Sequence, residues 1–289
     1  MKNYLSLIKF SHTIFAMPFA LVGFFLGIYQ SQSALNWQIL LCIVLCMIFA
    51  RSAAMAFNRY LDRDIDAINP RTAVREIPAG VISANSALVF IIVNCLLFVA
   101  TTWFINPICF YLSPIALLVV LGYSYTKRFT FLCHFVLGLG LSLAPIGAYL
   151  AVVGHFDFLP VLYSLIVLLW VSGFDIIYAL QDEDFDRNLN LNSVPVKLGK
   201  KGALMLSNIL HVVAAIILLI SVFTLNASQG GLSFGWMHWL GAGIFIALLI
   251  YQHTLVKVDD LSKVNLAFFT TNGIASVIYG SFFIIDYFF

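Results

Sequence analysis

The sequence predicts an all-α membrane protein, a bundle of nine transmembrane helices that forms one domain over residues 1–289. Hydrophobic residues make up 62% of the chain, charged residues only 10%, and the mean hydropathy is +1.00. Soluble domains carry about a quarter charged residues, so this composition is that of an integral membrane protein. The length allows about nine spans of roughly 20 residues each, joined by short loops.

Nine apolar stretches supply the predicted spans. Residues Ile105 to Pro107 read as a tight turn between the third and the fourth. Pro18, Pro114 and Pro145 fall within spans, where we expect them to kink helices around a buried cavity. In chain order, the predicted spans are 12–29, 37–57, 85–104, 107–122, 131–153, 159–180, 203–225, 236–255 and 265–288.

The charged residues sort to one side of this arrangement. All 15 Lys and Arg residues fall on the side that carries the N-terminus and the loops after spans two, four, six and eight. The positive-inside rule makes this side cytoplasmic, with the C-terminus opposite. Of the 13 acidic residues, only Asp157 and Asp286 lie on the far side. Topology does not require acids in cytoplasmic loops, so another reason must place them there.

Two acidic clusters follow apolar stretches. Asn58, Asp62 and Asp66 stand four residues apart, so a continuous helix would place them on roughly one face. Asp182 and Asp186 repeat the spacing. Like charges on one face repel each other, whereas a divalent cation would draw them together, and oxygen ligands suit Mg²⁺. We therefore predict these five residues as Mg²⁺ ligands.

The two clusters also mark an internal repeat. Asp182 and Asp186 each lie 120 residues after Asp62 and Asp66, and each pair ends the second span of a four-span block. The chain therefore reads as two four-helix pseudo-repeats plus one helix. An even number of spans separates the clusters, so both should reach the same membrane face, with a site between the halves.

The chemistry of these clusters points to a diphosphate. Mg²⁺ is usually shared between carboxylates and phosphate oxygens. Basic residues, which suit an anionic ligand, flank both clusters: Arg71, Arg75, Lys127, Arg128 and Lys197. A ligand with a diphosphate head and a hydrocarbon tail would fit the mouth of an intramembrane cavity. Departure of the diphosphate would leave an allylic cation, which aromatic side chains could stabilise.

At this point the motifs resemble those of the UbiA family of intramembrane aromatic prenyltransferases. Three segments, covering both clusters and the loop between spans four and five, carry the resemblance: Asn58-x-x-x-Asp62-x-x-x-Asp66 with Arg71-Thr72-x-x-Arg75-x-x-Pro78-x-Gly80, Tyr123-Ser-Tyr125-Thr-Lys127-Arg128, and Asp175-x-x-Tyr178-Ala179-x-x-Asp182-x-x-x-Asp186. The resemblance implies a nine-span fold, Mg²⁺-dependent transfer from a polyprenyl diphosphate, and a lateral opening to lipid. Arg59 departs from the family pattern, because many members carry Asp at this position.

Arg51 bears on the acceptor. It lies seven residues before Asn58, two helical turns back on about the same face. A cation at the bilayer centre costs on the order of 2.5–3.5 kcal/mol on insertion scales, and less near the edge. The resemblance implies that Arg51 binds an acceptor carboxylate, as in the 4-hydroxybenzoate branch; the alternative is that it snorkels or pairs with an Asp of the site. 4-Hydroxybenzoate is our first acceptor, and a dihydroxynaphthoate of a menaquinone route is the second.

Asp175, seven residues before Asp182, is expected to support the metal or to polarise the acceptor hydroxyl. The histidines show no ligand spacing. The residues expected to carry catalysis are Asp62, Asp66, Asp175, Asp182 and Asp186. Those expected to bind substrate are Arg51, Asn58, Arg71, Arg75, Lys127, Arg128, Tyr178 and Lys197.

The expected product is a quinone precursor, formed at the cytoplasmic side of a bacterial inner membrane. We expect no nucleic-acid partner, and the sequence leaves the oligomeric state open. A secondary transporter is the rival class, since repeats, kinked spans and intramembrane acids also suit transport. It is disfavoured because the acids cluster at one membrane face, whereas alternating access needs a site at the midplane.

Overall fold

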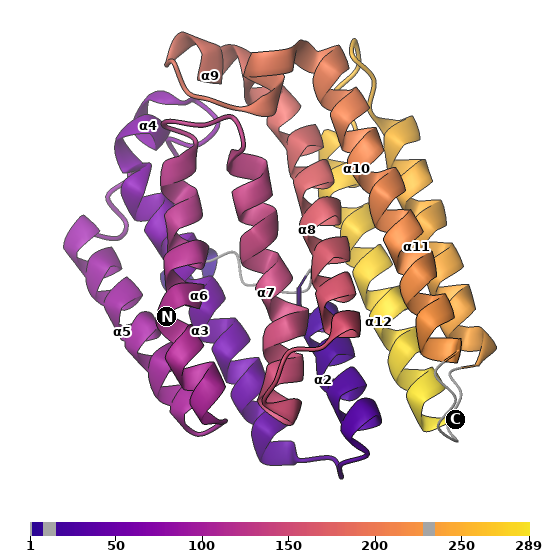
Figure 1. The fold of residues 1–289 in the computed structure, drawn as a ribbon. Helices are drawn as coiled ribbons and strands as arrows, with labels where there is room; N and C mark the ends of the chain where they lie inside the picture. Colours follow the sequence, from indigo (N-terminus) through magenta and orange to yellow (C-terminus); the bar gives the residue numbers. More distant parts are fainter. Residues whose placement is uncertain (1, 8–15, 228–234) are drawn as a thin grey trace.

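The computed structural model describes residues 2–7, 16–227 and 235–289, and these are built of helices, as predicted. Long helices stand side by side in one bundle (Figure 1). In chain order they are α2 (Met17–Ser31), α3 (Trp37–Leu61), α5 (Ala84–Trp103), α6 (Pro107–Thr126), α7 (Cys133–Val153), α8 (Phe158–Ala179), α10 (Val194–Ala227), α11 (Trp236–Leu255) and α12 (Asn272–Phe288). The short α1 (Lys2–Leu7) precedes them.

Each expected span overlaps one of these helices within the described residues. Seven helical segments are long and apolar enough to cross a membrane. Of the other two, α2 is apolar but has only 15 described residues, because residues 12–15 of its expected range lie outside the described part of the chain. The other, α11, has 20 residues but carries polar His238, Gln252 and His253 near its ends. The chain is therefore a multi-pass membrane protein with at least seven candidate spans.

Side-chain caps and prolines set several helix ends. The Asn36 carboxamide accepts from the first backbone N–H groups of α3, and Asn106 does the same for α6. Asn106 also donates to the carbonyl of Leu150 at 2.8 Å, which ties the predicted 105–107 turn to α7. Pro114 and Pro145 lie inside helices, but the expectation of a kink at Pro18 was wrong. Pro18 stands in the first turn of α2, where its missing N–H costs nothing.

The acidic clusters lie at helix breaks rather than on straight helices. The backbone turns at Asp62, with φ −91° and ψ 8°, between α3 and the short α4 (Arg63–Ile68). It turns in nearly the same way at Asp182, with φ −104° and ψ 2°, before the short α9 (Glu183–Asn188). Asn58, Asp62 and Asp66 therefore do not lie on one face of a continuous helix, as the spacing predicted, because the helix breaks at Asp62. Figure 1 shows α4 and α9 at the same end of the bundle, consistent with two related halves.

The largest core cluster joins α2 of the first half to the helices of the second half. Large aromatic side chains from α2, α8, α11 and α12 are fully buried there, with Phe19 packed against Trp170, Phe245 and Tyr279. Gly138 of α7 allows close packing on α8, because an added Cβ would lie 2.5 Å from the carbonyl oxygen of Leu168. By contrast, α5 and α6 expose many large apolar side chains, as expected of helices that face lipid.

Candidate active site

A cavity of about 740 Å³ lies under the end of the bundle that carries α4 and α9. Both halves contribute to its walls, as the repeat predicts. Its polar end includes Asn58, Asp62, Asp66, Arg71, Arg75, Lys127, Arg128, Asp182 and Asp186. Its deeper part includes Arg51, Met55, Tyr123, Leu137, Leu141, Val171, Phe174, Asp175, Tyr178, Phe268 and Phe269. A charged mouth above a partly apolar chamber suits an amphipathic ligand.

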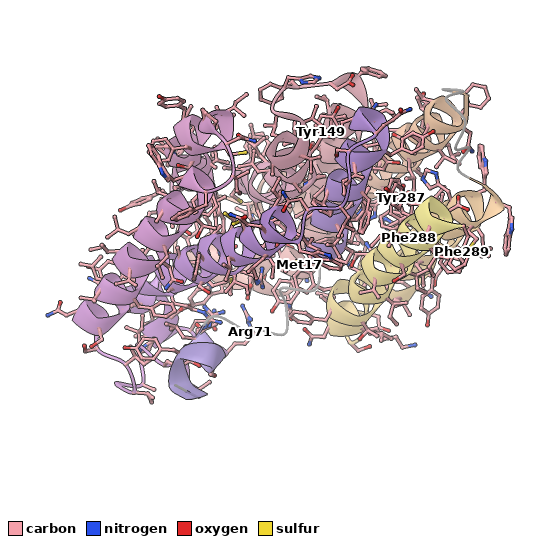
Figure 2. The ribbon with its side chains drawn as sticks, turned by 90° about the horizontal axis from the view of Figure 1, so that it is seen from below. Met17, Arg71, Tyr149, Tyr287, Phe288 and Phe289 are labelled. Atoms are coloured by element: carbon pink, nitrogen blue, oxygen red, sulfur yellow. The ribbon has the colours of Figure 1, made fainter. Side chains whose placement is uncertain are left out.

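Each acid of the two clusters forms an ion pair with its own cation. Two of the pairs join the halves of the bundle: Arg71 contacts both oxygens of Asp182 at 2.9 and 2.8 Å, and the Lys127 ammonium lies 2.6 Å from Asp186. The other two pairs are Arg75 with Asp66 at 2.7 Å and Arg128 with Asp62 at 2.9 Å. In the view down the bundle, Arg71 lies between the violet helices of the first half and the yellow α12 (Figure 2).

Hydrogen bonds shape the first cluster further. The Asn58 amide donates to Oδ2 of Asp62 at 3.1 Å, and Arg128 also donates to the backbone carbonyl of Leu61. Burial raises the pKa of the Asp62 carboxyl, although the hydrogen bond from Arg128 opposes this rise. Burial lowers the pKa of the Arg71 guanidinium, but the Asp182 charge and the Tyr178 hydroxyl outweigh it and raise that pKa overall. These side chains are held by one another at the mouth of the cavity.

The carboxylate and amide oxygens of the two clusters are suitable Mg²⁺ ligands, although in this structure each carboxylate is paired with a basic side chain. Within residues 2–7, 16–227 and 235–289, no group of three or more His, Cys, Asp or Glu residues is gathered around a metal position. Asp186 is only 1% exposed; one of its carboxylate oxygens lies 2.6 Å from the Lys127 ammonium, and the other has no hydrogen-bond donor among the described residues. A buried carboxylate oxygen without a donor is the kind of hard ligand that Mg²⁺ takes. Asn58, Asp62, Asp66 and Asp182 supply further oxygens around the same cavity.

Arg51 lies in the cavity wall without a counter-ion. It forms no ion pair or hydrogen bond with any described residue, and its Nε is buried without an acceptor. The expected alternative in which Arg51 pairs with an acid of the site is therefore not seen in the described part of the chain. A buried guanidinium without an anion is suited to a ligand carboxylate.

Asp175 belongs to a pair that the sequence did not reveal. The Nδ1 of His134 on α7 lies 2.6 Å from Oδ2 of Asp175 on α8. The backbone N–H of Val194 donates to the Nε2 of His134 at 3.3 Å, so in the neutral ring the proton stands on Nδ1 and points to Asp175. His134 is buried, and both residues line the cavity. The pair spans 41 residues, and no local spacing could have disclosed it.

Two aromatic residues of the wall were also missed. A π-helix, η3 (Leu266–Thr271), precedes α12 and brings Phe268 and Phe269 to the cavity. The rings of Phe268 and Tyr178 lie 4.2 Å apart, and the Tyr178 hydroxyl accepts from Arg71 at 3.4 Å. In the sequence, both phenylalanines fall within the predicted span 265–288 as two of its many apolar residues, so nothing there marks them as wall residues.

One expected binding residue is placed elsewhere. Lys197 is exposed in the first turn of α10 and is not among the residues that line the cavity. The sequence placed it near the second cluster because it follows Asp186 by only eleven residues. The chain instead passes through the 189–193 segment before α10 begins, and this turns the Lys197 side chain to the outside. The structure does not bring Lys197 to the other expected ligands.

Comparison with known proteins identifies relatives over most of the chain. The family described as the UbiA prenyltransferase family matches residues 16–274. The 4-hydroxybenzoate octaprenyltransferase of Aliivibrio fischeri (strain MJ11) is 31% identical over 247 residues, which are 84% of this chain and 82% of that protein. The protein of the same name from Aliivibrio salmonicida (strain LFI1238) is 29% identical over 246 residues, 84% of this chain and 83% of that protein.

Solved structures share the fold. The apo structure of a UbiA homolog from Aeropyrum pernix K1 superposes with a TM-score of 0.83 at 30% identity, covering 96% of this chain and 98% of that one. A UbiA homolog from Archaeoglobus fulgidus bound to DMAPP and Mg²⁺ superposes with a TM-score of 0.77 at 21% identity, covering 98% of each chain.

Proposed function

The chain belongs to the UbiA prenyltransferase family, and we propose that it transfers the polyprenyl group of a polyprenyl diphosphate to a ring carbon of 4-hydroxybenzoate, in a Mg²⁺-dependent reaction. The observation that carries this proposal is the pairing of a charged cavity mouth with an unpartnered arginine, Arg51, in the chamber below. Relatives named 4-hydroxybenzoate octaprenyltransferase support the acceptor. A fold neighbour bound to DMAPP and Mg²⁺ supports the donor and the metal.

The donor would bind at the mouth. Asn58, Asp62, Asp66, Asp182 and Asp186 would hold Mg²⁺, which would neutralise the diphosphate and help it to leave. The cations now paired with these acids would turn to the phosphate oxygens: Arg71, Arg75, Lys127 and Arg128. The C–O bond of the allylic diphosphate then breaks, and its electron pair leaves with the diphosphate. The rings of Tyr178, Phe268 and Phe269, which line the cavity, would stabilise the allylic cation that remains.

The acceptor would bind below the diphosphate. Arg51 would hold the carboxylate, and Asp175 would accept a hydrogen bond from the hydroxyl, which makes the ring richer in electrons. His134 fixes the orientation of Asp175 by its 2.6 Å contact. The ring carbon ortho to the hydroxyl attacks the cation, and a C–C bond forms. The proton of that carbon then passes to water or to the released diphosphate, which restores the aromatic ring. The product is a prenylated aromatic acid, a quinone precursor.

The same proposal includes a membrane arrangement. The helices count as nine spans if α2 and α11 also cross, and the end that carries α4 and α9 faces the cytoplasm of a bacterial cell. The basic loop residues at this end support the orientation. The apolar surfaces of α5 and α6 would face lipid, from which the prenyl chain can reach the cavity.

The test is a product assay. The purified chain is incubated with Mg²⁺, geranyl diphosphate and either 4-hydroxybenzoate or a dihydroxynaphthoate, and products are identified by mass. We expect a geranylated 4-hydroxybenzoate and release of diphosphate, both abolished by EDTA. If only the dihydroxynaphthoate is prenylated, the acceptor assignment changes to the naphthoate and the proposed prenyl transfer stands. No product with either acceptor at any chain length, with the diphosphate intact, would reject prenyl transfer and favour transport.

A further inference from the structure

Arg59 is a buried arginine that the reaction described above does not use. It stands in the last turn of α3, is 5% exposed and lines the cavity. Its Nε and Nη1 are enclosed without any acceptor, and Arg59 forms no ion pair or hydrogen bond with the described residues. Arg71, Arg75 and Arg128, by contrast, are each matched to a carboxylate of the same cavity.

The acids around Arg59 are already engaged. Its charged and titratable neighbours are Arg75, Asp66, Glu76 and Tyr123. Asp66 binds Arg75 through both oxygens, at 2.7 and 2.8 Å, and Glu76 accepts a 2.5 Å hydrogen bond from Ser6. Neither carboxylate forms an ion pair with Arg59 or accepts a hydrogen bond from it. An ionised guanidinium in this position keeps unsatisfied N–H groups until an anion enters the cavity.

The position of Arg59 indicates which ligand anion it would bind, the diphosphate of the donor or the carboxylate of the acceptor. Arg59 directly follows Asn58 and precedes Asp62 by three residues, so it borders the cluster at the cavity mouth. Arg51, on the same helix, is eight residues deeper, which is ~12 Å at 1.5 Å per residue. A carboxylate held by Arg51 therefore does not reach Arg59, whereas a phosphate group at the mouth does.

We propose that Arg59 is a direct binding residue for the diphosphate of the prenyl donor, an inference that rests on the proposed function. The guanidinium fork binds a phosphate through two parallel N–H···O bonds, and it needs no metal for this contact. Many family members carry Asp at this position, and this chain has a cation there instead. The diphosphate group should therefore retain measurable affinity for this protein without Mg²⁺.

The experiment measures binding and does not depend on turnover. Inorganic diphosphate and an unreactive thiolo analogue of geranyl diphosphate are titrated into the purified full chain by calorimetry, once with EDTA and once with Mg²⁺. We compare wild type with Arg59→Gln and Arg59→Lys, and use Arg63→Gln on α4 as the control, since Arg63 lies outside the cavity lining. In EDTA, we expect Arg59→Gln to weaken both ligands by about tenfold or more, Arg59→Lys to retain part of the affinity, and Arg63→Gln to match wild type.

Two further measurements separate the possible roles of Arg59. If it bound only the substrate, the ligand-free Arg59→Gln variant would melt no lower than wild type, because no partner is lost; a large fall in Tm would assign Arg59 a structural role and overturn the proposal. Unchanged diphosphate affinity, or a raised KM for the acceptor alone, would also overturn it. If wild type forms product and Arg59→Gln binds diphosphate as well as wild type does, only this inference is rejected. If diphosphate binding depends on Arg59 but wild type forms no product, the proposed reaction is rejected.

Discussion

The indole Nε1 of Trp170 on α8 donates a 2.8 Å hydrogen bond to the Asn272 side chain, which begins α12. The amide of Asn272 in turn donates to the carbonyls of Ala267 and Phe268, both at 2.9 Å. These carbonyls belong to the π-helix η3, whose wider turns do not satisfy every backbone group in the usual way. One buried amide thus joins two helices and holds the turn that carries Phe268 to the cavity.

Replacement of Asn272 should therefore disturb both stability and catalysis. Asn272→Leu leaves the Trp170 N–H and the two carbonyls without this partner, and we expect a loss of about 1–3 kcal/mol in the free energy of unfolding. Because Phe268 stacks on Tyr178, kcat should fall as well. The check is thermal unfolding together with steady-state kinetics. Trp170→Phe, which removes only one donor, is the matched control and should cost less; equal Tm values for Asn272→Leu and wild type would contradict this role of Asn272.

The acceptor assignment can be tested at Arg51. Arg51→Ala and Arg51→Gln remove a guanidinium that has no partner among the described residues. We expect the KM for 4-hydroxybenzoate to rise by more than about tenfold while the KM for the prenyl diphosphate changes little, since only the carboxylate loses its partner. Arg51→Lys should recover part of the affinity. Equal effects on both KM values would show that Arg51 does not distinguish acceptor from donor.

The pair formed by His134 and Asp175 predicts a graded effect on kcat. Asp175→Asn removes the negative charge that would polarise the acceptor hydroxyl, and we expect kcat to fall by roughly 10²-fold or more. His134→Phe leaves Asp175 in place but free to rotate, so its loss should be smaller. Single-turnover rates at saturating substrates measure both. If His134→Phe costs as much as Asp175→Asn, orientation alone explains the effect and the charge has no separate role.

Removal of Lys127 offers a test of the metal site by stability alone. Asp186 is buried, so Lys127→Met leaves a carboxylate without its counter-ion. This costs about 3–5 kcal/mol for a fully buried pair and less here, because the Lys127 side chain is partly exposed. In EDTA, the variant should therefore melt well below wild type. Added Mg²⁺ should raise the Tm of Lys127→Met more than that of wild type, because the metal would replace the lost cation.

The control for this experiment is Lys201→Met, an exposed position on α10. It should behave as wild type with and without Mg²⁺. A Tm of Lys127→Met that Mg²⁺ does not raise would count against Asp186 as a metal ligand.

The sequence predicts the charged residues at the mouth of the cavity better than the contacts in the chamber below. Asp62, Asp66, Asp182 and Asp186 are recognisable because charge is rare in an apolar chain and its regular spacing stands out. Their position at one end of the bundle follows from the number of spans between them. Charge, spacing and the number of spans can all be read directly along the chain. The structure agrees that both clusters lie at one end of the bundle, although the backbone bends at Asp62 and Asp182.

Contacts between distant segments could not be predicted in this way. His134 meets Asp175 only because α7 and α8 pack together, and the hydrogen bond to Val194 comes from a third segment. The π-helix at Phe268 is hydrogen-bonded by the Asn272 amide, a contact that the hydropathy of the sequence does not indicate. Lys197 was misplaced for the opposite reason, since nearness in sequence to Asp186 suggested a nearness in space that the start of α10 prevents.

The one-to-one matching of four acids with four bases has an electrical consequence. Without ligand, these eight side chains carry no net charge, and a diphosphate that arrives with its divalent counter-ions adds little, because the two nearly cancel. A charge moved fully across a membrane exchanges about 2.3 kcal/mol per 100 mV with the transmembrane potential. The carboxylate of the acceptor, which would enter to meet Arg51, leaves again with the product. A complete turnover therefore moves almost no net charge through that field and should proceed at the same rate in energised and in de-energised membranes.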